Sequence, residues 1–162
     1  MKKLQIFLAL LALAFLFNAC GTVSYHSSYR GSKSLNHKNI SSELIRVQKQ
    51  WQRTPYKLGG VSPKGADCSG FTQSVLSKHF NTKIPRTTVA QMKGGKKISK
   101  SSLKSGDLLF FKTGRGPNGI HVGIYVQKDE FIHLSTKGGV KKVSFSTKYW
   151  KPKYIGARRY IK

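Results

Sequence analysis

The spacing of apolar residues changes along the chain, and this change limits the fold more than any other feature. Up to Gly94-Gly95 the apolar residues recur with a helical period, which predicts helices. From residue 107 onward, short segments rich in β-branched and aromatic residues are separated by turn residues, as in strands. Helices followed by strands predict an α+β fold, with N-terminal helices packed on one side of an antiparallel β-sheet.

The expected elements have recognisable ends. The first helix begins at Ser41, which can cap it, and ends before Pro55, because the residue before a proline avoids the α region. The second spans about residues 68–79 and is capped by Asp67. The third is short and opens with a capping box at 88–91. Strands are expected at residues 107–112, 121–127, 130–135, 141–145 and 154–161.

The first nineteen residues have the form of an export signal. Two lysines precede an apolar run at residues 4–17, which is too short for a transmembrane helix and typical of a signal peptide. The sequence Phe17-Asn18-Ala19-Cys20 resembles a bacterial lipobox, so we expect cleavage before Cys20 and acylation of that residue. The lipid would anchor the protein in the cell envelope. Gly21 favours the periplasmic face of the outer membrane in a Gram-negative cell.

The rest of the chain divides into two parts. Residues 20–40 are rich in Ser, Gly, Lys, Asn and His, which predicts a flexible tether. Residues 41–162 are long enough for one domain with a single core. The net charge of +25 would indicate nucleic acid as the partner of a cytosolic protein. Export argues against nucleic acid and favours anionic lipid headgroups or wall carboxylates, with a solvated basic surface as the alternative.

Cys68 has no second thiol to pair with in this domain, because the only other cysteine is Cys20. Exported proteins usually bridge their cysteines or have none, so a lone thiol indicates a catalytic nucleophile. A small buried hydrophobe is the alternative. At the start of a helix, the partial positive charge and free N–H groups favour the thiolate and can hold an oxyanion. We therefore expect the pKa of Cys68 to lie below its ordinary value.

Two histidines are placed to act with this thiol. His121 begins one expected strand and His133 lies in the next. Both histidines face the helix only if the residue numbers of cross-strand partners add up to an even number, as when Val126 pairs with Glu130. The sequence therefore predicts an odd-length hairpin loop, with His121 as base and His133 accepting the N–H of its ring. A zinc site formed by the cysteine and both histidines is a further alternative, although the spacing matches no common pattern.

Seven motifs, in order, resemble the NlpC/P60 cysteine peptidases between about Glu43 and Tyr160. They are Thr54-Pro55-Tyr56 with Gly59-Gly60, Asp67–Phe71, Pro85–Thr88 with Gln91, Gly106–Phe111, His121–Tyr125, Phe131–His133, and Tyr149-Trp150 with Ala157–Arg159. The resemblance implies a papain-like NlpC/P60 fold with Cys68 as nucleophile, His121 as base and His133 as third polar residue. It also implies hydrolysis of peptidoglycan stem peptides, at the γ-D-Glu–diamino acid bond or the D-Ala–diaminopimelate cross-link. We expect a monomer without a cofactor or metal.

The resemblance also assigns residues around the thiol. Tyr56 matches a tyrosine that lines the site and helps to hold the oxyanion, or it is only a packing aromatic. Asp67 and Ser69 match positions that bind the free amine of a short wall peptide in some relatives, or they only cap the helix. Arg86 meets a substrate carboxylate or packs the loop.

Two other functions stay open. A non-catalytic, wall-binding adaptor lipoprotein would keep its function when Cys68 is replaced by alanine. A thiol acyltransferase or lipid amidase on a related fold would need an exposed apolar patch beside the cleft. Only the tether precedes the predicted domain, without an SH3-like domain to close the cleft. An open cleft would suit polymeric or cross-linked wall.

Overall fold

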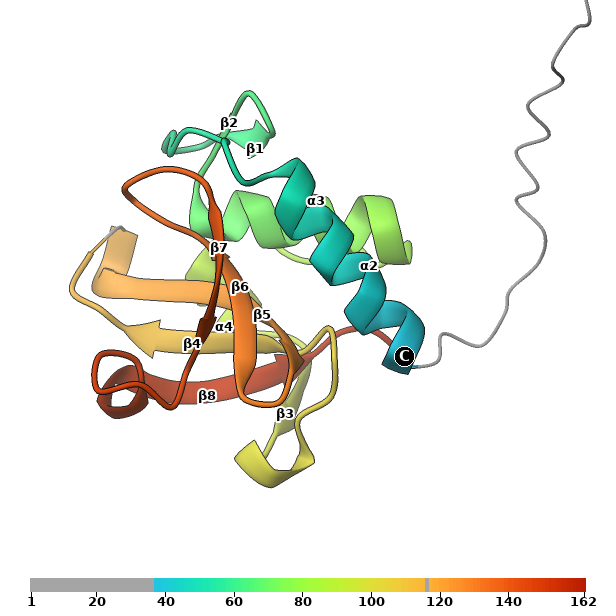
Figure 1. Cartoon of the computed structure of the whole chain (residues 1–162). Coiled ribbons are helices and arrows are strands. Elements are labelled where there is room, and N and C mark those ends of the chain that lie inside the picture. Colours follow the sequence, from blue (N-terminus) through green and yellow to red (C-terminus); the bar gives the residue numbers. More distant parts are fainter. Residues whose placement is uncertain (1–36, 116) are drawn as a thin grey trace, which may run out of the picture. The chain divides into compact units, whose positions relative to one another are not determined.

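The structure is a computed structural model that describes residues 37–115 and 117–162 (Figure 1). The predicted signal segment, Cys20 and most of the predicted tether lie outside the described residues. Within the described ranges, none of the helices has both the length and the apolar character needed to cross a membrane.

An antiparallel sheet in the order β3-β8-β4-β5-β6-β7 forms the centre of the fold. Its strands are β3 (Lys96–Ile98), β4 (Leu108–Lys112), β5 (Ile120–Gln127), β6 (Glu130–Leu134), β7 (Val140–Ser144) and β8 (Tyr154–Arg159). The last five confirm the predicted strands. Strand β3 was not predicted, because three residues are too few to show an alternating pattern. A small hairpin of β1 (Val61–Ser62) and β2 (Gly65–Ala66) stands apart from the sheet. Single 3₁₀ turns occur at Lys100–Ser102, Pro117–Gly119 and Lys151–Lys153.

Helices α2 (His37–Gln50) and α3 (Cys68–Phe80) lie on one face of the sheet, as predicted (Figure 1). Helix α2 begins before Ser41, so the prediction that Ser41 caps it was wrong. The reason is that Ile40 extends the apolar stripe of Leu44 and Val47 by one position, and all three side chains are buried. The predicted boundary between tether and domain therefore falls inside this helix.

The caps of the next two helices differ in how well the sequence predicted them. Asp67 caps α3 as predicted, since its carboxylate accepts a hydrogen bond from the Gly70 N–H. Helix α4 (Thr88–Lys93) is capped by Thr87, whose hydroxyl accepts from the Ala90 N–H. Thr88, the predicted cap, is instead buried. Its hydroxyl is therefore available to the interior of the protein.

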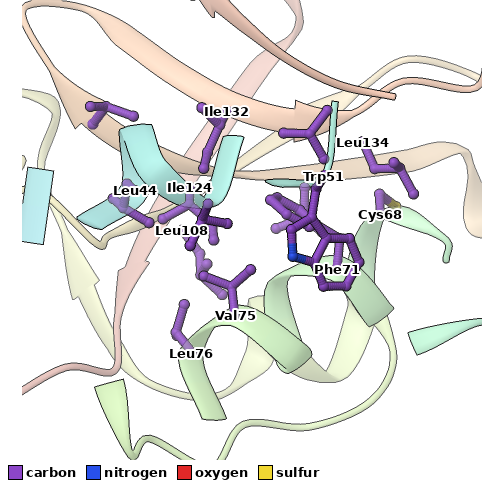
Figure 2. Close-up of a cluster of buried hydrophobic side chains, with 14 of the residues drawn as sticks. Leu44, Trp51, Cys68, Phe71, Val75, Leu76, Leu108, Ile124, Ile132 and Leu134 are labelled. Atoms are coloured by element: carbon purple, nitrogen blue, oxygen red, sulfur yellow. The ribbon is translucent and has the colours of Figure 1, made fainter. Parts of the chain in front are cut away.

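The two faces of the sheet carry separate apolar clusters. The first lies between the sheet and helices α2 and α3, and Figure 2 shows Cys68 at one end of it. Even-numbered positions of β5 and β6, such as Ile124 and Ile132, belong to this cluster. The second cluster, on the other face, contains Phe111, Phe131 and Trp150. Alternation along the strands therefore separates a face covered by helices from an aromatic face.

Strands β5 and β6 form the predicted hairpin, but its loop has an even length. Gln127 pairs with Glu130 across a two-residue loop, Lys128-Asp129, in which both residues have positive φ. The prediction of an odd-length loop was therefore wrong. A bulge between Tyr125 and Gln127 restores the even register, so that Tyr125 pairs with Phe131. The extra residue in the bulge reverses which face of the sheet the preceding residues of β5 point to. The two histidines therefore share a face, as they would with an odd-length loop.

Candidate active site

Cys68 is the first residue of α3, and only 4% of its surface is exposed. Its Sγ lies 3.7 Å from the Oγ1 of Thr88 and receives hydrogen bonds from the backbone of Val122 and Ser69. The sulfur therefore lies between the start of α3 and the start of β5, beside Val122, the residue that follows His121. It lines a cavity of about 370 Å³. The walls of this cavity include Leu58, Gly59, Asp67, Ser69, Arg86, Thr87, Thr88 and Asn118.

Burial raises the pKa of the Cys68 thiol above its ordinary value. Hydrogen bonds from Thr88, Val122 and Ser69 act in the opposite direction, while the charge of Asp67 adds to the rise. The expectation of a lowered pKa was therefore wrong, because desolvation of the thiolate outweighs the stabilising contacts at the helix start.

His121 and His133 are in direct contact. The Nε2 of His121 lies 3.0 Å from the Nδ1 of His133, and both side chains are buried. Burial lowers the pKa of His121 to about 3, with a further contribution from the charge of His133. Burial likewise lowers the pKa of His133 to about 4, to which the charge of Lys141 contributes. Both rings are neutral at neutral pH, so one of them donates and the other accepts across this contact.

The aromatic face of the sheet fixes the two histidines. The Trp150 ring centroid is 4.9 Å from that of His133 and 5.7 Å from that of His121, and Phe131 stacks on His133 at 5.3 Å. The two histidines share a face, as predicted. The prediction that this face is the one covered by the helices was wrong. Even-numbered residues of β5 and β6 pack under the helices, so the odd-numbered His121 and His133 lie on the other face. Cys68, at the start of α3, lies near this region because its sulfur contacts the backbone of Val122, the residue after His121.

Asp67 and Arg86 form a paired wall of the Cys68 cavity. Arg86 donates to both carboxylate oxygens of Asp67, at 2.9 and 2.7 Å, and to the hydroxyl of Ser69 at 3.0 Å. Gly59, Gly70 and Ser69 donate to the same carboxylate. Although burial alone would raise the pKa of Asp67, the hydrogen bonds from Arg86, Gly70 and Gly59 lower it. A substrate amine or carboxylate would have to displace one of these internal bonds.

Tyr56 lies close to the same site. Its ring packs against the first apolar cluster, and its backbone forms a bridge with Ala66. Burial raises the pKa of its phenol, and the charges of Cys68 and Asp67 raise it further. The structure therefore brings Tyr56, Asp67, Ser69 and the thiol together, as the motifs predicted.

Sequence reasoning missed two residues of the site. Thr88 contacts the sulfur, but its position in the sequence is also that of a helix cap. The only signal was the adjacent Thr87, which can cap α4 itself and so leaves the Thr88 hydroxyl for another contact. Trp150 covers the histidines, and its motif was noted without a role. The zinc alternative finds no geometric support, since residues 37–115 and 117–162 contain no group of three His, Cys, Asp or Glu arranged to hold a metal.

Comparison with known families decides the classification, since the profile described as the NlpC/P60 family matches residues 53–159. The chain belongs to the NlpC/P60 family. It is therefore a cysteine peptidase, and the helices packed on an antiparallel sheet are the NlpC/P60 fold predicted from the motifs.

The chain is similar to several curated proteins of this family. It is 46% identical to a Haemophilus influenzae protein named "Probable endopeptidase", over 98% of this chain and 99% of that protein. It is 38% identical to the Escherichia coli "Probable endopeptidase NlpC", over 94% and 98% of the two chains. The Escherichia coli "Murein DD-endopeptidase MepS/Murein LD-carboxypeptidase" is 40% identical over 76% of this chain and 64% of that protein.

Solved structures give the same family. An NlpC/P60 family protein from Bacillus cereus has a TM-score of 0.66 and 33% identity, over 75% of this chain and 40% of that one. The NlpC/P60 domain of the peptidoglycan hydrolase SagA has a TM-score of 0.59 and 33% identity, over 74% of this chain and 97% of that domain.

Proposed function

We propose that this protein is a peptidoglycan endopeptidase that hydrolyses amide bonds in wall stem peptides through Cys68. The observation that carries this proposal is the 3.0 Å contact between His121 and His133. The residue after His121, Val122, contacts the sulfur of Cys68 through its backbone. Names of relatives that include murein and peptidoglycan support the substrate. Both the γ-D-Glu–diamino acid bond and the D-Ala–diaminopimelate cross-link are compatible with this proposal.

The first half of the reaction forms a thioester. His121 uses its Nε2 in the contact with His133, so Nδ1 is the ring atom available to accept the thiol proton. The raised pKa of the thiol favours transfer of this proton as Sγ attacks the substrate carbonyl carbon. The N–H groups at the start of α3, together with Tyr56, would hold the oxyanion. His121 then gives the proton to the nitrogen of the scissile bond, and the amine leaves.

The second half of the reaction restores the enzyme. A water molecule gives a proton to His121 and attacks the thioester carbon, which releases the carboxylic acid. The proton returns to Sγ. In both halves His133 accepts the ring N–H of His121 and keeps it in one orientation, which is the role of the third residue in a catalytic triad.

The location of the enzyme is part of the proposal. Acylation of Cys20 would anchor the chain at the periplasmic face of the outer membrane, and the tether would let the catalytic domain reach the wall. The net charge of +25 would favour contact with wall carboxylates or anionic headgroups.

Digestion of purified peptidoglycan tests the proposed function. The chain without residues 1–19, with Cys20→Ala to prevent acylation, would be incubated with sacculi and with isolated stem peptides. Released fragments would be identified by mass spectrometry, with Cys68→Ala as the control. New termini that require Cys68 identify an endopeptidase and the bond it cuts. Binding to sacculi without any thiol-dependent cleavage would favour the adaptor function instead.

A further inference from the structure

A second cavity, of about 180 Å³, lies on the histidine side of the site. It is lined by Thr113, Arg115, His121, His133, Ser135, Thr136, Lys137, Tyr149 and Trp150. Two of these side chains are cations, four carry hydroxyls, and none of the described residues in the lining is acidic. The chemistry of this cavity is therefore suited to an anion with several oxygen acceptors.

The two cations come from two different loops, and each loop has the same local hydrogen bond. The backbone N–H of Arg115 lies 3.4 Å from the hydroxyl of Thr113, and that of Lys137 lies 3.2 Å from the hydroxyl of Ser135. Such side-chain-to-backbone bonds fix the turn that presents the following side chain. Arg115 follows β4 and Lys137 follows β6, so the tertiary structure brings together charges that are 22 positions apart in the sequence.

The position of His121 identifies which part of a substrate this cavity receives. His121 contributes to the second cavity, whereas Cys68 contributes to the first. In the proposed reaction the imidazole gives its proton to the nitrogen that leaves. The leaving residue must therefore lie beside His121, and the second cavity is the space that adjoins this ring.

We propose that Arg115 and Lys137 bind a free carboxylate on the residue that leaves as the amine. This inference rests on the proposed function and extends it to substrate recognition. In both candidate bonds the leaving residue is a diamino acid, and diaminopimelate carries a second carboxyl group that the peptide chain leaves free. In the D-Ala cross-link this carboxylate is on the same carbon as the scissile nitrogen, so it enters the cavity together with the leaving amine.

A carboxylate in this cavity would also favour the chemical step. When Cys68 attacks, His121 becomes a cation beside a cavity that Arg115 and Lys137 also line, and the charge of Lys141 already lowers the pKa of the neighbouring His133. A bound anion would offset this positive field and stabilise the imidazolium. Substrates without the carboxylate would lack both the binding contact and this compensation.

Matched substrates and matched variants test the inference. Two cross-linked stem peptides would be prepared that differ only in the leaving diaminopimelate, which carries a free carboxylate in one and a carboxamide in the other. The Cys20→Ala chain without residues 1–19 would be compared with its Arg115→Gln and Lys137→Gln variants. Lys97→Gln is the control, because Lys97 is an exposed cation on β3, the strand at the opposite edge of the sheet from β7.

The parent chain is expected to prefer the carboxylate substrate by about tenfold in kcat/KM, as for a charge-assisted contact. Each cavity variant is expected to lose most of this preference, because its kcat/KM for the carboxylate substrate should fall, in both KM and kcat, far more than its kcat/KM for the carboxamide substrate. Lys97→Gln is expected to keep the preference. Equal cleavage of both substrates by the parent chain would overturn the inference and leave the proposed function intact. Cleavage of neither substrate, nor of sacculi, would overturn the proposed function and this inference with it.

Discussion

The Nε2 of His121 and the Nδ1 of His133 lie 3.0 Å apart, inside an aromatic shell formed by Trp150 and Phe131. This contact joins the start of β5 to the end of β6. It uses one nitrogen of His121, and in the proposed mechanism the other nitrogen accepts the thiol proton. One neutral ring donates and the other accepts across this contact, and in the proposed mechanism His121 is the donor.

Replacing His133 should lower turnover without loss of substrate binding. His133→Leu removes the acceptor for the His121 N–H, and we expect kcat to fall about a hundredfold with KM nearly unchanged. His133→Gln retains an acceptor oxygen and should recover part of the lost kcat. Steady-state kinetics on a stem peptide would measure both variants. A parallel loss of kcat and thermal stability in both variants would instead indicate a purely structural role.

The thiol of the free enzyme should react slowly at neutral pH. Because burial raises the pKa of Cys68, its alkylation by iodoacetamide should increase with pH through a midpoint above about 8.5, the ordinary value. The same chain unfolded in urea provides the reference for an exposed thiol. A plateau of fast alkylation below pH 7 in the folded chain would contradict this prediction and would indicate a preformed thiolate.

Thr88 should influence the reactivity of the thiol. Its hydroxyl lies 3.7 Å from Sγ and lowers the pKa of Cys68, so Thr88→Val should raise that pKa further and lower kcat. We expect an effect of about fivefold on kcat, corresponding to about 1 kcal/mol for one hydrogen bond. Thr88→Ser keeps the hydroxyl and should behave like the parent chain. Identical alkylation profiles for Thr88→Val and the parent would show that the contact has no effect on the sulfur.

Asp67 should stabilise the fold in a pH-dependent manner. Its pKa is lower in the folded chain than in the unfolded chain, so its contribution is present above the unfolded pKa of about 4. That contribution is lost as the pH falls through the lower folded-state pKa. Asp67→Asn leaves Arg86 without a charged partner and should reduce the free energy of unfolding at pH 7 by about 2 kcal/mol.

Urea unfolding at several pH values would measure this effect. The difference between the parent chain and Asp67→Asn should shrink as the pH falls below about 4, because the carboxylate of the parent is then neutralised. Glu130→Gln is a suitable control, since Glu130 pairs with Lys142 at an exposed position of the sheet and should cost less. A difference between parent and variant that stays constant from pH 7 to pH 2 would argue against a role of the Asp67 charge.

Much of the site could be predicted because its signals are local. Asp67 is followed directly by the helix that it caps, so the position of Cys68 at a helix start was visible in the sequence. The strands that carry His121 and His133 were also visible, since period-two alternation depends on neighbouring residues. The bulge near Tyr125 was not visible, because it depends on how two strands pair and not on either strand alone.

The sequence alone determined the main element types, the order of the motifs and the choice of Cys68, His121 and His133 as the candidate catalytic residues, since each depends on spacing along the chain. Only the tertiary structure decided the face of the sheet that carries the histidines, the direction in which the pKa of Cys68 is shifted, and the partner of Thr88. Each of these depends on burial between segments that are distant in sequence. Desolvation raised the pKa of Cys68 against the local effect of the helix start, and the close packing of α2 and α3 directed the histidines to the opposite, aromatic face.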